Sequence, residues 1–279
     1  MIRLLEIEFQ KIWKNRASRV LTIAYFVILS FIALIASIKF KIGNFELQIA
    51  DQGIFNFPYI WHFNTYIAAL LKFFLAIVIV SMMANEYSYG TLKQNLIDGL
   101  SKREFIQSKF LTVLAFALGS TLFVFVMSLL LGFSFSSYTE IGIVFSDLEY
   151  LLAYFLKLTA FFSFCLFLGI LVKRSAFALG FLFVWNIIEG IGIGVLKFKI
   201  FKGSDDYQYI TQFFPLESMS NLIREPFSRL SVIKSIEETI GGEAIARDYG
   251  VGIVPLLIVG AWIVIFMLMS YKILQKRDL

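Results

Sequence analysis

The sequence ANEYSYGTLKQNLIDGLSKREFIQSKF, residues 84–110, is the longest polar run in the first half of the chain, and an apolar run lies on each side of it. Both apolar runs have about the 20 residues that an α-helix needs to cross the hydrocarbon core of a bilayer. A polar segment in this position predicts a connection that joins two membrane-spanning helices outside the bilayer.

The composition indicates a membrane protein. Of the 279 residues, 59% are hydrophobic and 16% are charged, whereas soluble domains have about 45–50% apolar and about 25% charged residues. The polar residues are too few to cover a water-soluble surface. The net charge of +5 comes from basic residues that flank the apolar runs. This placement orients a protein in a membrane, so nucleic-acid binding is not expected.

Six apolar runs are long enough to span a bilayer. No run alternates with the period of two that barrel strands show, so the spans are expected to be helices. The predicted fold is an all-α polytopic membrane protein with one transmembrane domain over residues 1–279. The first run is longer than the roughly 7–15 apolar residues of a signal peptide, so it is expected to be retained. The predicted spans are residues 20–38, 64–84, 111–133, 151–172, 176–196 and 251–272.

Lysine and arginine residues predict the orientation of the spans. The segments before span 1, between spans 2 and 3, between spans 4 and 5, and after Tyr271 carry five, four, two and three of them. The short loops 39–63 and 134–150 carry two and none. The long segment 197–250 carries seven, but long loops translocate largely regardless of charge. Both termini are therefore expected in the cytoplasm, with the protein in the cytoplasmic (inner) membrane.

Residues 1–19 predict an amphipathic helix that lies in the membrane interface. Leu5, Phe9 and Ile12 fall on one helical face, and polar residues fall on the other. A basic amphipathic helix that carries tryptophan and lies next to a span is typical of an interfacial helix. It either only anchors the chain or also borders a cytoplasmic partner.

The segment 85–110 predicts ordered helices rather than a flexible connector. Gly90 and Thr91 end one helix and start a short one. Ser101 and Glu104 have the spacing of a capping box, which starts a further helix that continues into span 3. From the residues alone, this segment is either a docking element for another protein or a self-contained loop.

The same segment resembles the region after the second span in ABC-2-type transporter permeases. In that family an acidic residue precedes a Gly-Thr pair, a short amphipathic helix, a turn with serine and arginine, and a lysine. This chain has Glu86, Gly90–Thr91, Leu92–Ile97, Ser101–Arg103 and Lys109 in those places. The family also has an interfacial first helix, six spans with both ends inside, and a large last outward loop.

The resemblance implies a half-transporter, in which two permease subunits, identical or different, pair above two ABC ATPase subunits. Leu92–Ile97 would be the coupling helix, and ATP and magnesium would bind in the ATPase. This chain has no G-x-x-x-x-G-K-[ST] motif, so no catalytic residue or bound cofactor is expected in it. The substrate stays open between peptide, lipid, drug and ion. The implied coupling residues are Glu86, Gly90, Thr91, Leu92, Leu96, Ile97, Ser101, Arg103 and Glu104.

Three charged residues lie deep inside the predicted spans, where a charge costs about 2.5–3.5 kcal/mol. Lys72, Lys157 and Glu189 lie at similar depths, roughly 10–13 Å from the outer ends of their spans at about 1.5 Å per residue. Glu189 could therefore pair with either lysine, the lysines could extend to the interface, or the three could line the substrate path. Asn186, one turn before Glu189, is expected to hydrogen-bond between helices.

No metal site is expected. His62 is the only histidine and Cys165 the only cysteine, so the ligand set of a Cys/His site is missing. His62 is expected at the outer rim as an interface residue. The glycine-rich run 188–194 has no strand before it, as a phosphate-binding loop would need, so its glycines are expected to allow close helix packing.

The segment 197–250 is expected to fold against the outer mouth. Pro215 and Pro226 bracket one predicted short helix, and residues 231–250 predict another.

Two other functions are compatible with a polytopic membrane protein. An ion-driven secondary transporter would have inverted repeats and several acidic residues at mid-span. A non-transport scaffold or immunity protein would need no coupling helix.

Overall fold

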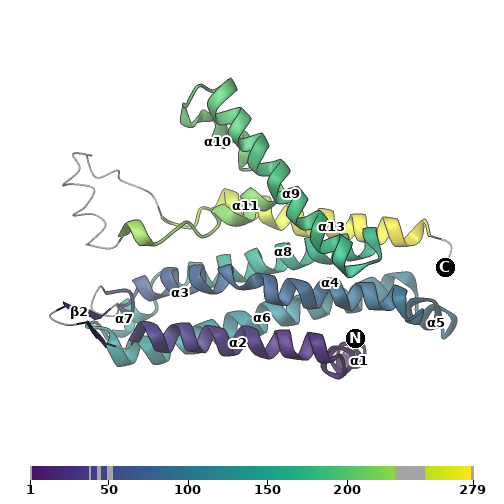
Figure 1. The fold of residues 1–279 in the computed structure, drawn as a ribbon, viewed down its shortest axis with the longest axis horizontal. Coiled ribbons are helices and arrows are strands. Elements are labelled where there is room, and N and C mark those ends of the chain that lie inside the picture. Colours follow the sequence, from purple (N-terminus) through teal and green to yellow (C-terminus); the bar gives the residue numbers. More distant parts are fainter. Residues whose placement is uncertain (1, 38, 43–44, 49–52, 230–248, 278–279) are drawn as a thin grey trace.

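The computed structural model describes residues 2–37, 39–42, 45–48, 53–229 and 249–277, and in these the chain is almost entirely helical (Figure 1). The start of α1, the end of α13 and α5 lie at one end of the helix bundle, and α7 lies at the other. The α-helices are α1 (Ile2–Lys14), α2 (Arg16–Ser37), α3 (Tyr59–Leu70), α4 (Lys72–Ser88), α5 (Thr91–Ile97), α6 (Lys102–Phe135), α7 (Ile141–Val144), α8 (Glu149–Val172), α9 (Ser175–Val195), α10 (Gln208–Thr211), α11 (Pro215–Asn221) and α13 (Ile253–Gln275).

Four helical segments are long and apolar enough to cross a membrane. They are α6, α7 with α8, α9 with its extension Leu196–Ile200, and α13. The pairs α1–α2 and α3–α4 pass the same test only when each bent pair is taken as one span. The described part of the chain therefore holds four to six candidate spans, as in a multi-pass membrane protein.

The first helix ends earlier than predicted. α1 and α2 meet at Asn15 with an angle of 94°, so the expected boundary after Arg19 is wrong. The Asn15 side chain accepts a hydrogen bond from the Ser18 amide at 3.1 Å, as an asparagine at a helix N-cap does. This cap starts α2 at Arg16.

The second predicted span, residues 64–84, is two helices rather than one. α3 and α4 are bent by 46° at Leu71. The amides of Leu71 and Phe74 bond to carbonyls three residues earlier, which is a tighter turn than that of an α-helix. No proline or glycine occurs at this position, so the apolar pattern carried no sign of the break.

The all-α prediction missed a β-hairpin between α2 and α3. β1 (Lys39–Ile42) pairs antiparallel with β2 (Phe45–Gln48), and Lys39 lies opposite Gln48. The strands KFKI and FELQ both alternate in polarity. This period-two pattern is too short to stand out beside runs of about 20 apolar residues.

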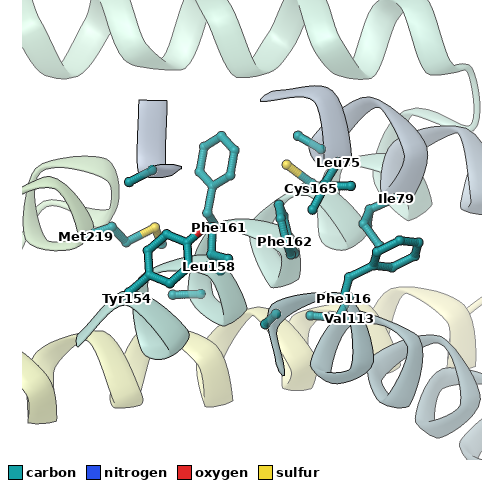
Figure 2. Close-up of a cluster of buried hydrophobic side chains, with 14 of the residues drawn as sticks. Leu75, Ile79, Val113, Phe116, Tyr154, Leu158, Phe161, Phe162, Cys165 and Met219 are labelled. Carbon is teal, nitrogen blue, oxygen red and sulfur yellow. The ribbon is translucent and has the colours of Figure 1, made fainter. Parts of the chain in front are cut away.

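α8 is the central helix. It packs against α4, α6, α9 and α13, and 78% of its most apolar part is buried, compared with 11% for α9. Figure 2 shows Tyr154 of α8 in the core that also holds Leu75 of α4 and Met219 of α11. The hydroxyls of Tyr25, Ser120 and Tyr154 hydrogen-bond to one another. This network gives the buried polar atoms partners and ties α2, α6 and α8 together.

The segment after α9 returns to the bundle. In Figure 1, α9 leans out of the bundle and carries α10 at its far end, and α11 lies back beside α13. α11 begins at Pro215, as predicted, and contacts α8, α9 and α13. Most of the second predicted helix, 231–250, lies outside the described residues.

Candidate functional site

The segment 84–110 contains α5 and the start of α6, the two helices that its helix-ending and helix-capping residues predicted. Gly90 precedes α5 with φ 67°, a left-handed conformation that glycine adopts without strain. The Glu104 amide donates to the Ser101 hydroxyl at 3.2 Å, and the Ser101 amide donates to the Glu104 carboxylate at 3.0 Å. The capping box is thus confirmed, and α6 continues from it through the third span to Phe135.

Four charged side chains gather beside α5 in a cluster that we call the α5 clamp: Glu8 and Lys11 of α1, Glu86 of α4 and Lys109 of α6. Lys109 Nζ lies 2.5 Å from Glu8 Oε2 and 2.5 Å from Glu86 Oε1. Lys11 Nζ lies 2.9 Å from Glu86 Oε1 and 3.4 Å from Glu8 Oε1. The Thr91 hydroxyl, on the first residue of α5, donates to Glu86 Oε2 at 2.5 Å.

The α5 clamp is buried and balanced in charge. Glu8, Glu86 and Lys109 are 4%, 2% and 0% exposed, and the Lys11 side chain reaches the surface. Two carboxylates face two ammonium groups, and all four carboxylate oxygens accept a hydrogen bond. A buried ion pair is stable only when its remaining polar atoms are also bonded. That condition is met, so the cluster fixes the start of α5 to α1, α4 and α6.

α5 has a buried side and an exposed side. Leu92 is 1% exposed and packs into the core. Ile97 is 75% exposed, and Tyr89, just before α5, is 73% exposed. Lys93 is exposed as well. The buried side holds α5 in place, and the outer side carries exposed apolar and basic side chains.

The residues that the resemblance pointed to divide between these two sides. Glu86 and Thr91 belong to the anchored side, and Leu96 is half-buried. The remaining residues are exposed at the end of the bundle: Gly90, Ile97, Ser101, Arg103 and Glu104.

Glu8 and Lys11 were not predicted to belong to this site. Glu8 comes three residues after Leu5 and four before Ile12, which places it on the apolar face of α1. The sequence did carry a sign that Glu8 belongs to a buried charged cluster, because it is an acidic residue on an apolar helical face. A buried carboxylate needs a cationic partner.

A second contact at this end joins α13 to α8. The Arg277 guanidinium donates to the carbonyls of Ile170 and Leu171 at 2.6 and 3.1 Å and to the Tyr87 hydroxyl at 2.7 Å. The last carbonyls of an α-helix have no helical partner, so a cation beside them is favourable. The Lys102 ammonium donates to the Arg277 carbonyl at 2.8 Å, which brings the start of α6 into the same contact.

Inside the spans, Glu189 forms no ion pair with Lys72 or Lys157 among the described residues. Its carboxylate accepts hydrogen bonds from the backbone amides of Leu216 at 3.0 Å and Glu217 at 3.1 Å. Both amides are in the first turn of α11. Of the three alternatives for these residues, the pairing of Glu189 with a lysine therefore does not occur in the structure.

The ends of α11 explain why Glu189 and Lys157 do not pair with each other. Phe214, which precedes α11, provides no side-chain cap, so Glu189 accepts the bonds that a capping residue would accept. At the other end of α11, the Lys157 ammonium donates to the Ser220 carbonyl at 3.2 Å. Anions at a helix N-terminus and cations at its C-terminus are favoured by the helix dipole. Lys72 instead lies over the Phe161 ring, with its Nζ 4.3 Å from the ring centroid.

We expect Glu189→Gln to lower the free energy of unfolding by about 1.5–3 kcal/mol, the range for hydrogen bonds to charged groups. Glutamine keeps one carbonyl oxygen but loses the charge that faces the N-terminus of α11. Denaturation of the purified chain in detergent measures this change. The control is Glu217→Gln on α11, whose side chain accepts only from the exposed Asn221, and it should shift stability by less than about 0.5 kcal/mol. Equal effects of the two variants would contradict the capping role of Glu189.

His62 is buried rather than placed at an open rim. Its Nε2 lies 2.9 Å from the Arg224 carbonyl, and its ring stacks on Tyr150 with centroids 4.4 Å apart. The Arg229 guanidinium donates to His62 Nδ1 at 3.2 Å and lies 5.0 Å from the Tyr59 ring centroid. His62 thus attaches the segment after α11 to α3 and α8. Among the described residues, no group of three or more His, Cys, Asp or Glu side chains could hold a metal ion.

Comparison with known proteins identifies relatives of this arrangement. A family model described as "ABC-2 family transporter protein" matches residues 4–189, about two thirds of the chain. The matched range contains α5 and all four residues of the α5 clamp. An uncharacterized protein of Bacillus subtilis (strain 168), YhcI, is 39% identical over 66 residues, which are 24% of this chain and 21% of that protein.

Proposed function

Because the chain belongs to the ABC-2 transporter family, we propose that it is the permease subunit of an ATP-driven exporter and that a separate subunit hydrolyses the ATP. Membership makes it a membrane component of a transport system. The ATPase partner, the outward direction and the pairing of two permeases belong to the proposal.

The placement of α5 carries the proposal. A helix that receives force from a partner must be accessible on one side and rigidly attached on the other. α5 meets both conditions, since Ile97 is 75% exposed and Thr91 is bonded to the buried α5 clamp. A self-contained loop would not require a cluster of four charges from three helices, three of them buried, to hold its first residue.

In the proposed mechanism, two ATPase subunits bind ATP and magnesium and close against each other beneath the permeases. Each ATPase holds one α5, so closure displaces α5. The displacement passes through Thr91 and Glu86 to α4, through Lys109 to α6, and through Glu8 to α1. The chain itself performs no chemistry; it converts movement of the partner into movement of its spans.

The proposed assembly contains a second permease copy, identical or different. α9 is the least buried of the four unbroken candidate spans, and apolar side chains such as Phe177 and Phe183 are 65% and 67% exposed on it. A surface of this kind faces lipid or another span. The proposed orientation places both termini and α5 in the cytoplasm and the chain in the cytoplasmic membrane.

Purification of the affinity-tagged full chain from its native host tests this function. An ABC ATPase is expected to copurify, and the complex is expected to hydrolyse ATP. Identification of the captured subunit by mass spectrometry and measurement of phosphate release are the two readouts. A chain that is folded, purified in mild detergent and free of any ATPase would overturn the proposal.

A further inference from the structure

A cavity of about 370 Å³ lies between α4, α8, α9 and α11, away from α5. Its volume falls within the roughly 300–1,000 Å³ that is usual for small-molecule sites. Most of its walls are apolar, and the polar residues Lys72, Asn186 and Ser220 also line it. The apolar lining includes Phe73, Phe161, Leu182 and Phe183.

The cavity holds a cation without an anionic partner in the described part of the chain. Lys72 Nζ lies 4.3 Å from the Phe161 ring centroid, and no carboxylate described in the structure lies within ion-pair distance of it. Lys157 donates to the carbonyl of Ser220, which also lines the cavity, at 3.2 Å. The nearby carboxylate of Glu189 is occupied by the amides of α11.

This surplus of positive charge lies at membrane depth, where an unpaired ion is costly. An anion from outside the chain would remove the imbalance. A neutral ligand would leave Lys72 unpaired. A cationic ligand would be repelled by Lys72. The chemistry of the cavity therefore selects a negatively charged head group.

The other residues that line the cavity are mostly apolar, so they favour a ligand that also has an apolar chain. Phe73 and Phe183 border the cavity and are 51% and 67% exposed, so it opens on the outside of the helix bundle. Leu182 and Phe161 lie deeper, at 4% and 2% exposure. The Asn186 amide on α9 adds a donor at the rim.

We infer that this cavity binds a single-chain anionic amphiphile of the fatty-acid class. The carboxylate pairs with Lys72 and accepts a hydrogen bond from Asn186, and the chain lies on Phe161, Leu182 and Phe183. In this position the ligand contacts both α4 and α9. This inference is independent of the ATPase partnership, because it concerns binding to the chain alone.

The test is equilibrium binding of radiolabelled oleate to the full chain in nanodiscs of a neutral phospholipid. Oleate should bind saturably. Lys72→Met should weaken binding roughly tenfold or more, as expected for loss of a charged contact, while Lys72→Arg should retain most of it. Lys199→Met, which removes an exposed lysine beyond the end of α9, should bind as the wild type does. If Lys72→Met does not fold, Asn186→Leu on the exposed rim should still weaken binding several-fold.

Competition distinguishes the sources of the binding energy. Unlabelled oleate should displace the label, and oleyl alcohol and inorganic phosphate should do so only at much higher concentrations. If oleyl alcohol competed as well as oleate does, the site would recognise only the apolar chain. If phosphate competed as well as oleate does, the site would recognise only the negative charge. Either result, absence of saturable binding, or full binding to both Lys72→Met and Asn186→Leu would overturn the inference.

Discussion

Lys109→Met is expected to lower the free energy of unfolding by about 3–5 kcal/mol, the cost of removing one partner from a buried ion pair. Lys109 is 0% exposed and contacts both Glu8 and Glu86 at 2.5 Å. Without its charge, two buried carboxylates share only Lys11. Thermal and chemical denaturation of the purified chain in detergent measure the loss.

A double-mutant cycle separates the ion pair from the packing of the lysine stem. Lys109→Met combined with Glu86→Gln should lose less stability than the two single variants together, with a coupling energy of about 0.5–3 kcal/mol. Lys93→Met removes an exposed lysine from α5 and should change stability by less than about 0.5 kcal/mol. Strict additivity of the pair would show that the α5 clamp does not act as an electrostatic unit.

Ile97→Glu is expected to weaken capture of the proposed ATPase by roughly tenfold or more, about 1.4 kcal/mol, while the permease stays folded. Ile97 is 75% exposed at the end of α5, so the substitution disturbs no core packing. A carboxylate placed in an interface pocket would be desolvated without a partner. Titration of the immobilised permease with the purified ATPase measures the affinity.

The structure offers a closely matched control for this variant. Ile141 on α7 is also an isoleucine, is 77% exposed, and lies at the opposite end of the bundle (Figure 1). Ile141→Glu should leave ATPase binding unchanged. If both variants bind as the wild type does, α5 is not the docking helix, and if both lose binding, the effect of Ile97→Glu is not specific to α5.

The features predicted well from the sequence are those that adjacent residues determine. The length of an apolar run decides whether a helix can span the bilayer, and it located the helical segments. The Ser101–Glu104 capping box and the helix break at Gly90 depend on adjacent residues, and both occur as expected.

Apart from the β-hairpin, the start of α2 and the break at Leu71, the features that were missed depend on contacts between distant residues. Glu189 is bonded to amides 27 and 28 residues away, and no spacing in α9 reveals them. Lys109 and Glu8 are 101 residues apart. The break at Leu71 has no proline or glycine to mark it, so the sequence carried no local sign of it.

α11 has unequal attachments at its two ends. Two backbone amides hold one end to Glu189 of α9, whereas a single bond of 3.2 Å holds the other end to Lys157 of α8. α11 also packs against α8 and α13, and its Met219 is buried in the core. A swing of α9 relative to α8 would therefore have to break either the two amide bonds to Glu189 or the contacts that hold α11 in the bundle. Distance measurements between labels on α8 and α11 would show which of the two breaks during turnover.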